Sequence, residues 1–346
     1  MTSRAASPGR SSGMQSWRAQ FVLLSAIWGS SFLCIKVLDG VWAPVQVALA
    51  RVALGAVFLV VVLAVRRTPL TRDPAAWKHV AVVGLLMNAL PFTLFAYGEQ
   101  HVSSVIAGLW NGTTPLMTLV AVLLLLPEER PDARRLAGVA GGFAGLVVLL
   151  GPWQGLGGGK LLGDAACALG ACCYGLGLTY TRRYLSARPE GGVSLAGAQL
   201  LCATAMLLVV APLEGAPSLA LDGGEIASAL VLGVLGSGLA YVLTHAIVRA
   251  AGATTFSLVT YVIPIFSTAL GVTILSESVS WNQPVGAAIV LGSMWAASRS
   301  QPRRAEGGAD MDVDLPQRPV ARVLEGVGSV GRDDRDVAGP RDELVA

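Results

Sequence analysis

The chain has 346 residues, of which 53% are hydrophobic and only 14% are charged, whereas a soluble domain carries about 25% charged residues. Together with a mean hydropathy of +0.62, this composition excludes an ordinary soluble protein and predicts an all-α polytopic membrane protein whose partner is the lipid bilayer. The net charge of +3 is small and scattered. It argues against a nucleic-acid partner, which would require basic residues gathered on one face.

The chain begins with a polar, basic segment that precedes the first apolar run. This segment lacks the small-residue cleavage site of a signal peptide, and many more hydrophobic segments follow it. We therefore expect residues 1–20 to form a cytoplasmic tail. Residues 300–346 are rich in glycine, proline and charges of both signs, a composition that predicts a disordered cytoplasmic tail.

Ten apolar segments lie between these tails, each near the roughly 20 residues that a membrane-spanning helix needs. The fifth and tenth are short enough to be buried or re-entrant helices, but the alternation of charged loops favours ten spans. Basic clusters such as Arg66 with Arg67 and Arg182 with Arg183 fall on alternate loops, which predicts that both termini are cytoplasmic. The expected spans are residues 21–37, 44–65, 80–97, 102–126, 136–150, 161–180, 193–213, 226–248, 253–275 and 285–297.

The two halves of the chain share a pattern. Residues 92–115 align without a gap to residues 241–264: an aromatic residue opens each segment, a polar turn follows about nine residues later, and a proline closes it. Residues 21–151 and 161–299 therefore form two repeats of five spans. Because five is odd, the second repeat crosses the membrane in the opposite sense. Inverted repeats are typical of secondary transporters, whose binding site lies near the bilayer midplane.

Three segments carry a resemblance to a known family: AIWGSSFLCIK (26–36), GLWNGTTPLMTLVAVLLLLPEE (108–129) and SGLAYVLTHAIVRAAGATTFSLVTYVIPIFSTALGVTILSES (237–278). Their order and duplication resemble the EamA group of the drug/metabolite transporter superfamily. That family usually has Glu-Arg at the ends of the fourth and ninth helices; Glu129-Arg130 fits, whereas Ser278 follows Glu277. The resemblance implies a ten-helix carrier of small metabolites in the bacterial inner membrane, commonly an exporter of amino acids or amphipathic drugs.

Arg51 lies about eight residues into the second expected span. A charge at mid-helix costs roughly 2.5–3.5 kcal/mol on insertion scales unless it is paired or faces water. Two interpretations stay open: a cavity-lining cation that attracts a carboxylate or is released by a proton, or an arginine that snorkels outward or bonds helix-end carbonyls. Gln199, near the matching place in the seventh span, keeps hydrogen-bonding capacity without charge.

His245 is the only histidine within an expected span, and an ordinary pKa of about 6.5 would suit proton coupling. A packing role for this histidine stays open. Asp164 lies near the start of its helix, and we expect Glu99 at the outer turn, in solvent. Lys36 is expected to snorkel outward from the end of the first span.

Prolines near the ends of the two aligned segments predict kinks, because a proline frees a carbonyl one turn earlier. Trp110 and Asn111 precede Pro115, and Tyr261 precedes Pro264. The kinked segments either form a cavity wall or serve packing alone. In the first span, Trp28-Gly29 matches Tyr174-Gly175 of the sixth, which indicates a shared cavity or packing face. The candidate cavity residues are Trp28, Arg51, Tyr97, Trp110, Asn111, Tyr174, Gln199, Tyr241 and Tyr261.

Small residues suit close helix packing. Gly138 with Gly142, and Gly141 with Gly145, form GxxxG pairs that allow contact within the bundle or in a homodimer. The five cysteines all lie in apolar segments without the paired spacing of a metal site or a disulfide framework, so we interpret them as packing residues. They are Cys34, Cys167, Cys172, Cys173 and Cys202.

The sequence favours a secondary-active transporter, most simply an exporter, that works by alternating access without a cofactor or a metal. An ATP-driven pump is disfavoured because GPWQGLGGGK (151–160) lacks the spacing of a phosphate-binding loop and is followed by Leu161. An enzyme would gather titratable residues or a nucleophile at one depth, and the spans do not. The remaining alternative is a membrane scaffold or sensor that keeps the transporter fold.

Overall fold

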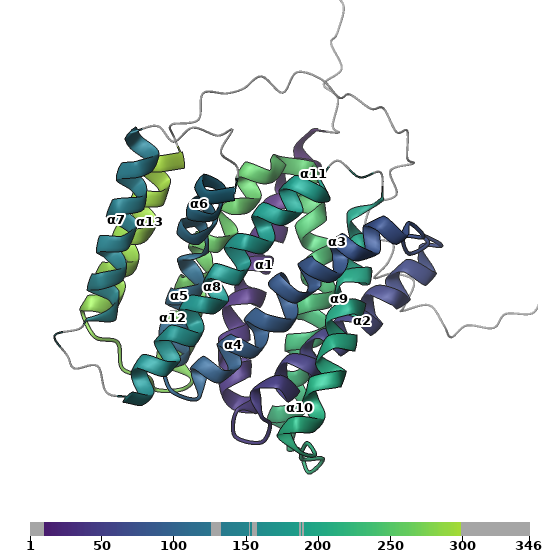
Figure 1. Cartoon of the computed structure of the whole chain (residues 1–346), viewed down its shortest axis with the longest axis horizontal. Helices are drawn as coiled ribbons and strands as arrows, with labels where there is room; N and C mark the ends of the chain where they lie inside the picture. Colours follow the sequence, from purple (N-terminus) through teal and green to yellow (C-terminus); the bar gives the residue numbers. More distant parts are fainter. Residues whose placement is uncertain are drawn as a thin grey trace, which may run out of the picture. The chain divides into compact units, whose positions relative to one another are not determined.

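The computed structural model describes residues 10–125, 133–151, 153, 158–186, 188 and 190–298. They belong to one compact unit, Met1–Ser300. Within these ranges every regular secondary-structure element is a helix and none is a strand (Figure 1). The predicted all-α class is therefore confirmed. The expectations for Glu128, Glu129 and Arg130, and for the tail after residue 299, lie outside the described residues.

The first half of the chain opens with two long helices and continues with pairs of shorter ones. The 29-residue helix α1 begins well before the expected span at residue 21, because polar residues can extend a helix beyond the lipid. The π-helix η1 joins α3 to α4 without a loop. The elements are α1 (Arg10–Leu38), α2 (Pro44–Val65), α3 (Pro74–Gly84), η1 (Leu85–Ala89), α4 (Leu90–Glu99), α5 (Ser104–Gly112), α6 (Thr114–Leu125) and α7 (Ala133–Leu150).

The second half has a similar series, including a second π-helix. Within α11, Gly252 adopts φ 83° and ψ 161°, a conformation that favours glycine, and it separates the helix into two parts. The elements are α8 (Gly158–Tyr184), α9 (Gly192–Val210), η3 (Ala211–Glu214), α10 (Gly223–Leu230), η4 (Val231–Leu239), α11 (Ala240–Ser257), α12 (Val259–Thr273) and α13 (Asn282–Ser298).

Seven helical stretches among the described residues are long and apolar enough to cross a membrane, and Leu136–Leu150 and Val259–Thr273 are shorter apolar helices. The chain is therefore a multi-pass membrane protein. The full count of ten spans stays a prediction. The seven stretches are Trp17–Leu38, Pro44–Val65, Pro74–Glu99, Ser104–Leu125, Gly159–Tyr184, Gly192–Glu214 and Gly223–Gly252.

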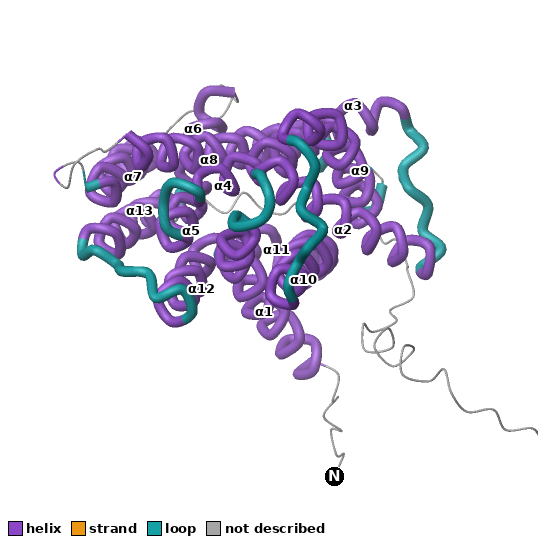
Figure 2. The backbone as a smooth tube through the Cα atoms, turned by 90° about the horizontal axis from the view of Figure 1, so that it is seen from below, coloured by secondary structure: helices purple, strands orange, loops and turns teal. Residues whose placement is uncertain are grey.

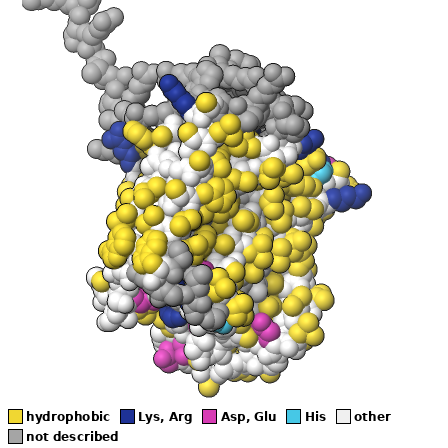
Figure 3. All heavy atoms as spheres, turned by 60° about the vertical axis from the view of Figure 1, so that its left-hand side comes forward, with side chains coloured by type: hydrophobic (Ala, Val, Ile, Leu, Met, Phe, Trp, Pro, Cys, Tyr) yellow, Lys and Arg dark blue, Asp and Glu magenta, His cyan; other side chains and the backbone are white. Residues whose placement is uncertain are grey.

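The outer surface fits a lipid environment. Figure 3 shows a face dominated by hydrophobic side chains, with most of the visible Lys and Arg toward the upper edge and most of the visible Asp and Glu toward the lower edge. Leu124, Val147 and Trp295 are among the side chains that are at least half exposed. Exposed apolar surface on this scale is typical of a membrane or protein contact surface, and the apolar helices of this chain fit contact with lipid.

Helices α7 and α13 lie side by side (Figure 1) and pack through glycine. A methyl group added at Gly145 would lie 2.8 Å from the main-chain nitrogen of Val290, and one at Gly141 would lie 2.5 Å from Ser293 Oγ. Gly142 meets Leu116 of α6 in the same way. The GxxxG residues thus serve contacts within the chain, and the homodimer stays a prediction.

The helices that enclose the centre of the bundle come from both halves. Figure 2 shows α1, α11 and α12 on one side and α4 and α8 on the other. α1 packs against α11 and α12, while α8 packs against α4 and α6. Each half therefore places its first long helix against later helices of the other half, and the space between them holds the candidate site.

Candidate functional site

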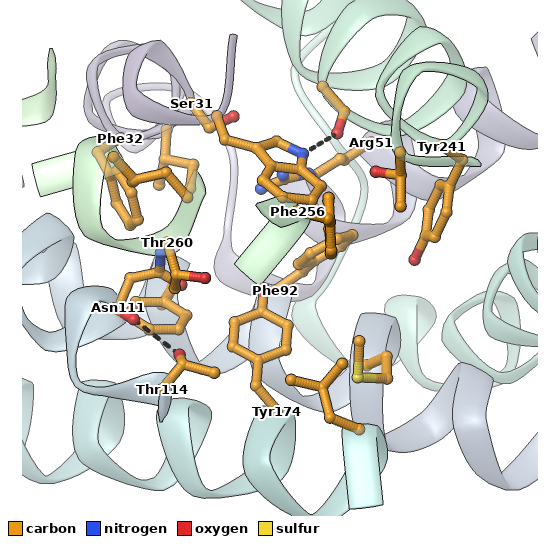
Figure 4. A pocket seen from close by; sticks show the side chains of 18 residues that line it. Ser31, Phe32, Arg51, Phe92, Asn111, Thr114, Tyr174, Tyr241, Phe256 and Thr260 are labelled. Atoms are coloured by element: carbon orange, nitrogen blue, oxygen red, sulfur yellow. Dashed lines mark hydrogen bonds between the residues drawn. The ribbon is translucent and has the colours of Figure 1, made fainter. Parts of the chain in front are cut away.

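A cavity of about 210 Å³ lies between the two groups of helices (Figure 4). Its walls come from α1, α2, α4, α8, α11 and α12, with further residues from the π-helices and from the α5–α6 junction. The lining residues are Trp28, Ser31, Phe32, Ile35, Arg51, Met87, Phe92, Phe95, Asn111, Thr114, Tyr174, Leu178, Gly236, Tyr241, Thr244, Phe256, Thr260 and Ile263.

Seven of the eighteen lining residues carry aromatic rings. Phe32 and Phe95 meet edge to face with ring centroids 5.8 Å apart, and Phe95 stacks with Tyr174 at 5.9 Å. Trp28 meets Phe256 edge to face at 6.2 Å and donates its indole N–H to the carbonyl of Gly236 at 3.1 Å. Such pairs add stabilisation beyond their buried area, so the wall is a fixed apolar surface.

Arg51 is the cation of this cavity among the described residues. The residue is buried, its Nε donates to Ser237 Oγ at 3.3 Å, and its guanidinium carbon lies 3.8 Å from the ring centre of Phe92. No described carboxylate lies within ion-pair distance of it. The structure therefore places Arg51 in the cavity rather than at a helix-end carbonyl or outside the bundle.

A buried polar network supports the wall behind Tyr241. The tyrosine hydroxyl accepts from Asn88 Nδ2 at 3.0 Å and from Gln199 Nε2 at 2.9 Å, and Gln199 also donates to Asn88 Oδ1. Gln199 thus orients Tyr241 and does not line the cavity itself. Asn88, in π-helix η1, was missed by the sequence analysis, although an asparagine within an apolar span is a signal for such a network.

The structure brings together Trp28, Arg51, Asn111, Tyr174 and Tyr241 from the nine candidate cavity residues. The others lie elsewhere. Trp110 is buried and donates its indole N–H to Asp164 Oδ1 at 2.8 Å. Tyr97 is 37% exposed and its ring lies beside His101, while Tyr261 packs against the main hydrophobic core.

His245, in α11, lies beside Gly192 at the start of α9, and its ring packs against the main chain there. It does not line the cavity, although its neighbour Thr244 does. Its role in proton coupling stays a prediction.

The two proline segments meet each other. A helix break occurs at Thr113, two residues before Pro115, and another occurs at Leu258, whereas Pro264 lies inside α12. A methyl group added at Gly112 would lie 2.7 Å from Pro264 Cγ. Nearby hydroxyls satisfy the carbonyls at the first break, since Thr113 Oγ1 donates to Trp110 O and Thr114 Oγ1 to Asn111 O, each at 2.7 Å.

One end of the bundle holds charged residues that the sequence analysis placed wrongly. The side chain of Glu99 is fully buried, so the expectation of a solvated residue is wrong: Cys167 of α8 packs directly against the preceding Gly98. Lys36 does not snorkel freely outward, because its ammonium donates to the main-chain carbonyls of Glu99 and Val102.

Glu277 forms a cap across the two halves. Its carboxylate accepts from Ser104 N at 2.9 Å, Ser104 Oγ at 2.9 Å and Val105 N at 3.0 Å. The negative charge therefore lies at the N-terminus of α5, where the helix dipole favours it. A role for Glu277 does not require an arginine at position 278.

Two groups outside the spans have shifted pKa values. Burial raises the pKa of Asp39 to about 7, and the nearby Lys36 opposes this shift. Arg188 donates to Asp73 at 2.5 Å, and this hydrogen bond lowers the pKa of the Asp73 carboxyl. No cluster of three or more metal-ligating His, Cys, Asp or Glu side chains occurs within the described ranges.

The bundle and its cavity define a membrane transporter of small molecules. A model of the EamA-like transporter family matches residues 16–151 and 161–299. The chain belongs to this family, as its resemblance implied, and the family is one of transporters.

Relatives and a solved structure agree with this assignment. Protein PagO of Salmonella typhimurium is 27% identical over 130 residues, which cover 38% of this chain but only 42% of PagO. Protein PecM of Dickeya dadantii is 26% identical over 273 residues, covering 78% of this chain and 87% of PecM. A protein of known crystal structure matches with a TM-score of 0.58 at 21% identity, covering 82% of this chain and 97% of that one; this likeness shows the fold alone.

Proposed function

We propose that the chain is a secondary-active exporter of small amphipathic compounds that carry a carboxylate, including aromatic amino acids, in the bacterial inner membrane. The observation that carries the proposal is Arg51, a buried cation that shares a cavity with aromatic rings and has no described carboxylate partner. A guanidinium in such a site matches a carboxylate through two parallel hydrogen bonds. The rings match an apolar body, and Asn111 and Thr260 offer further polar contacts.

Alternating access through two inverted repeats of five spans forms part of this proposal. It is supported by a contact that occurs twice: Gly29 of α1 packs against Phe266, and Gly175 of α8 packs against Met117. The register that aligns residue 92 with residue 241 also aligns Met117 with Phe266. Trp28 and Tyr174, which precede the two glycines, both line the cavity.

The π-helices support the same proposal. Residues 85–89 and 231–239 are π-helical, and they occupy overlapping positions in the register that aligns the halves. Each lies shortly before a cavity-lining aromatic residue, Phe92 or Tyr241. π-helical segments occur frequently at functional sites, and one in each half would let the halves exchange conformations.

We infer the orientation of the protein in the membrane from the positions of its basic loops. The basic loops predict that both termini are cytoplasmic, with residues 66–73 and 182–188 on the inner side. The end of the bundle that holds Lys36, Asp39 and Glu99 is then the outer end.

The test is uptake into liposomes that contain the purified protein. Radiolabelled phenylalanine, alanine and phenethylamine separate the two recognition features, since alanine lacks the ring and phenethylamine lacks the carboxylate. We expect phenylalanine to be preferred. We also expect Arg51→Gln to abolish its uptake, while the exposed Arg72→Gln leaves it unchanged.

Two outcomes would overturn the proposal. Uptake of phenethylamine that equals uptake of phenylalanine would reject carboxylate recognition by Arg51. No uptake of any compound across a wider panel of amino acids and drugs, with the protein folded, would instead favour the scaffold or sensor alternative.

A further inference from the structure

Glu99, the last residue of α4, carries a buried carboxyl group without a hydrogen-bond partner. None of its surface is exposed, and neither carboxyl oxygen has a partner among the described residues. The nearest ammonium group, Lys36 Nζ, donates instead to main-chain carbonyls, those of Glu99 and Val102. An ionised carboxylate in such a place would cost several kcal/mol. Burial without a partner therefore favours the neutral, protonated carboxyl group over the carboxylate.

The charged side chains around Glu99 include both carboxyl groups and cations. Asp39 and Glu277 place carboxyl groups near Glu99, and Lys36 and Arg51 place cations near it. Glu277 is already engaged with the N-terminus of α5, so Lys36 and Asp39 are the groups that can respond. The titratable and charged groups that face Glu99 are Lys36 and Cys34 of α1, Asp39 after it, Arg51 of α2, Cys167 of α8 and Glu277 between α12 and α13.

Glu99 lies directly beyond one end of the cavity. It follows the cavity-lining Phe95 by four residues on α4, just as Lys36 follows Phe32 by four residues on α1. One helical turn rises about 5.4 Å, so both polar side chains lie one turn past the Phe32–Phe95 ring pair. Asp39 follows Lys36 at the end of the bundle. The residue is partly exposed, but both of its carboxyl oxygens are buried without a hydrogen-bond partner among the described residues, and burial raises its pKa to about 7.

We propose that Glu99 is the proton-binding site of this carrier and that Asp39, whose carboxyl oxygens are buried in this conformation, passes the proton to water when this end of the bundle opens. When α1 and α4 separate at this end, Lys36 leaves the two carbonyls and pairs with the ionised Glu99. The O–H bond of Glu99 breaks, a new one forms on the Asp39 carboxylate, and the proton then passes to water. Proton coupling rests on the proposed transport function, but proton binding by Glu99 does not.

The test measures how many protons the purified protein takes up, and it needs no substrate. Purified protein in a weakly buffered detergent solution is brought from pH about 9 to pH about 6, above the ordinary range of exposed carboxylates, and an indicator dye reports the protons taken up. We expect Glu99→Gln to take up about one proton fewer per chain than the wild type. Glu225→Gln, at an exposed capping residue, is the matched control and should equal the wild type.

Infrared spectroscopy supplies a site-specific readout. The carbonyl band that protonated Glu99 contributes should titrate in the wild type, be missing in Glu99→Gln and persist in Asp39→Asn, which loses only the separate band of Asp39. A proton count in Glu99→Gln equal to that of the wild type, or an unchanged infrared band, would overturn the proposal.

A second variant covers the case in which Glu99→Gln fails to fold. Lys36→Met removes the cation that would pair with ionised Glu99, so proton uptake should move to higher pH. An unchanged titration in this variant would also overturn the proposal. These titrations need no substrate, so their failure would reject the proton site and leave the proposed Arg51-dependent uptake untouched. Conversely, a protein that binds the proton at Glu99 but transports no compound would reject only the proposed transport function.

Discussion

The paired close contacts at Gly29 and Gly175 give a prediction that tests the centre of the bundle without a known substrate. A methyl group at Gly175 would lie 2.6 Å from the main-chain carbon of Met117 and 2.8 Å from the nitrogen of Thr118. One at Gly29 would meet Phe266 Cβ and would lie 3.1 Å from the carbonyl oxygen of Ile263. Main-chain atoms cannot rotate away, so either alanine must push two helices apart.

We expect Gly29→Ala and Gly175→Ala each to lower the free energy of unfolding by about 1–3 kcal/mol, the usual cost of overpacking. Each also displaces the adjacent cavity aromatic, Trp28 or Tyr174, so phenylalanine uptake should fall as well. Thermal unfolding of the purified protein in detergent, followed by intrinsic tryptophan fluorescence, measures the loss of stability.

Gly292→Ala is the matched control, because nothing lies within 4 Å of a methyl group at this helical position. It should be neutral or should stabilise the protein by up to about 1 kcal/mol. If Gly175→Ala were as stable as Gly292→Ala, the close approach of α8 to α6 would be refuted. If only one of the two central glycines were sensitive, the proposed equivalence of the halves would fail.

Three further predictions concern polar groups. Tyr241→Phe removes the hydroxyl that Asn88 and Gln199 share and should cost about 1–3 kcal/mol of stability; a melting temperature equal to that of the wild type would contradict this. Glu277→Gln weakens the cap of α5 and should cost about 0.5–2 kcal/mol in the same assay, and no loss would mean that water replaces the cap. Because the folded-state pKa of Asp39 is raised to about 7, its neutral form stabilises the protein at low pH; this contribution should fade as pH rises from about 4 through 7. Asp39→Asn should flatten that dependence, and an unchanged profile would contradict the assignment.

Hydropathy located most helices because it depends only on the residues within each segment and not on tertiary contacts. The expected span 44–65 coincides with α2 (Pro44–Val65), and the break between expected spans eight and nine lies at Gly252. The helix ends were less predictable, since α1 starts at Arg10 and α3 at Pro74. Polar residues continue a helix past the lipid where its backbone hydrogen bonds can continue.

Side-chain roles were harder to predict, because they depend on how each helix is rotated and on what packs against it. The sequence left two positions open for the Arg51 side chain, inside a cavity or at the outside or end of the bundle. Its contacts with Ser237 and Phe92 in the structure decided in favour of the cavity. Trp110 precedes a helix break as expected, yet its indole reaches Asp164 on α8 and not the cavity. Glu99 ends its helix as expected but is covered by its neighbours.

By itself, the sequence determined the all-helical membrane class, the family, and the presence of a few polar and aromatic residues within the spans. These follow from composition, periodicity and order along the chain. Only the tertiary structure decided which of those residues share a cavity and that the carboxyl groups of Glu99 and Asp39 are buried without hydrogen-bond partners among the described residues. The physical reason is that burial and hydrogen bonding are set by contacts between residues far apart in the chain, as between Lys36 and Glu99 or between Ser104 and Glu277.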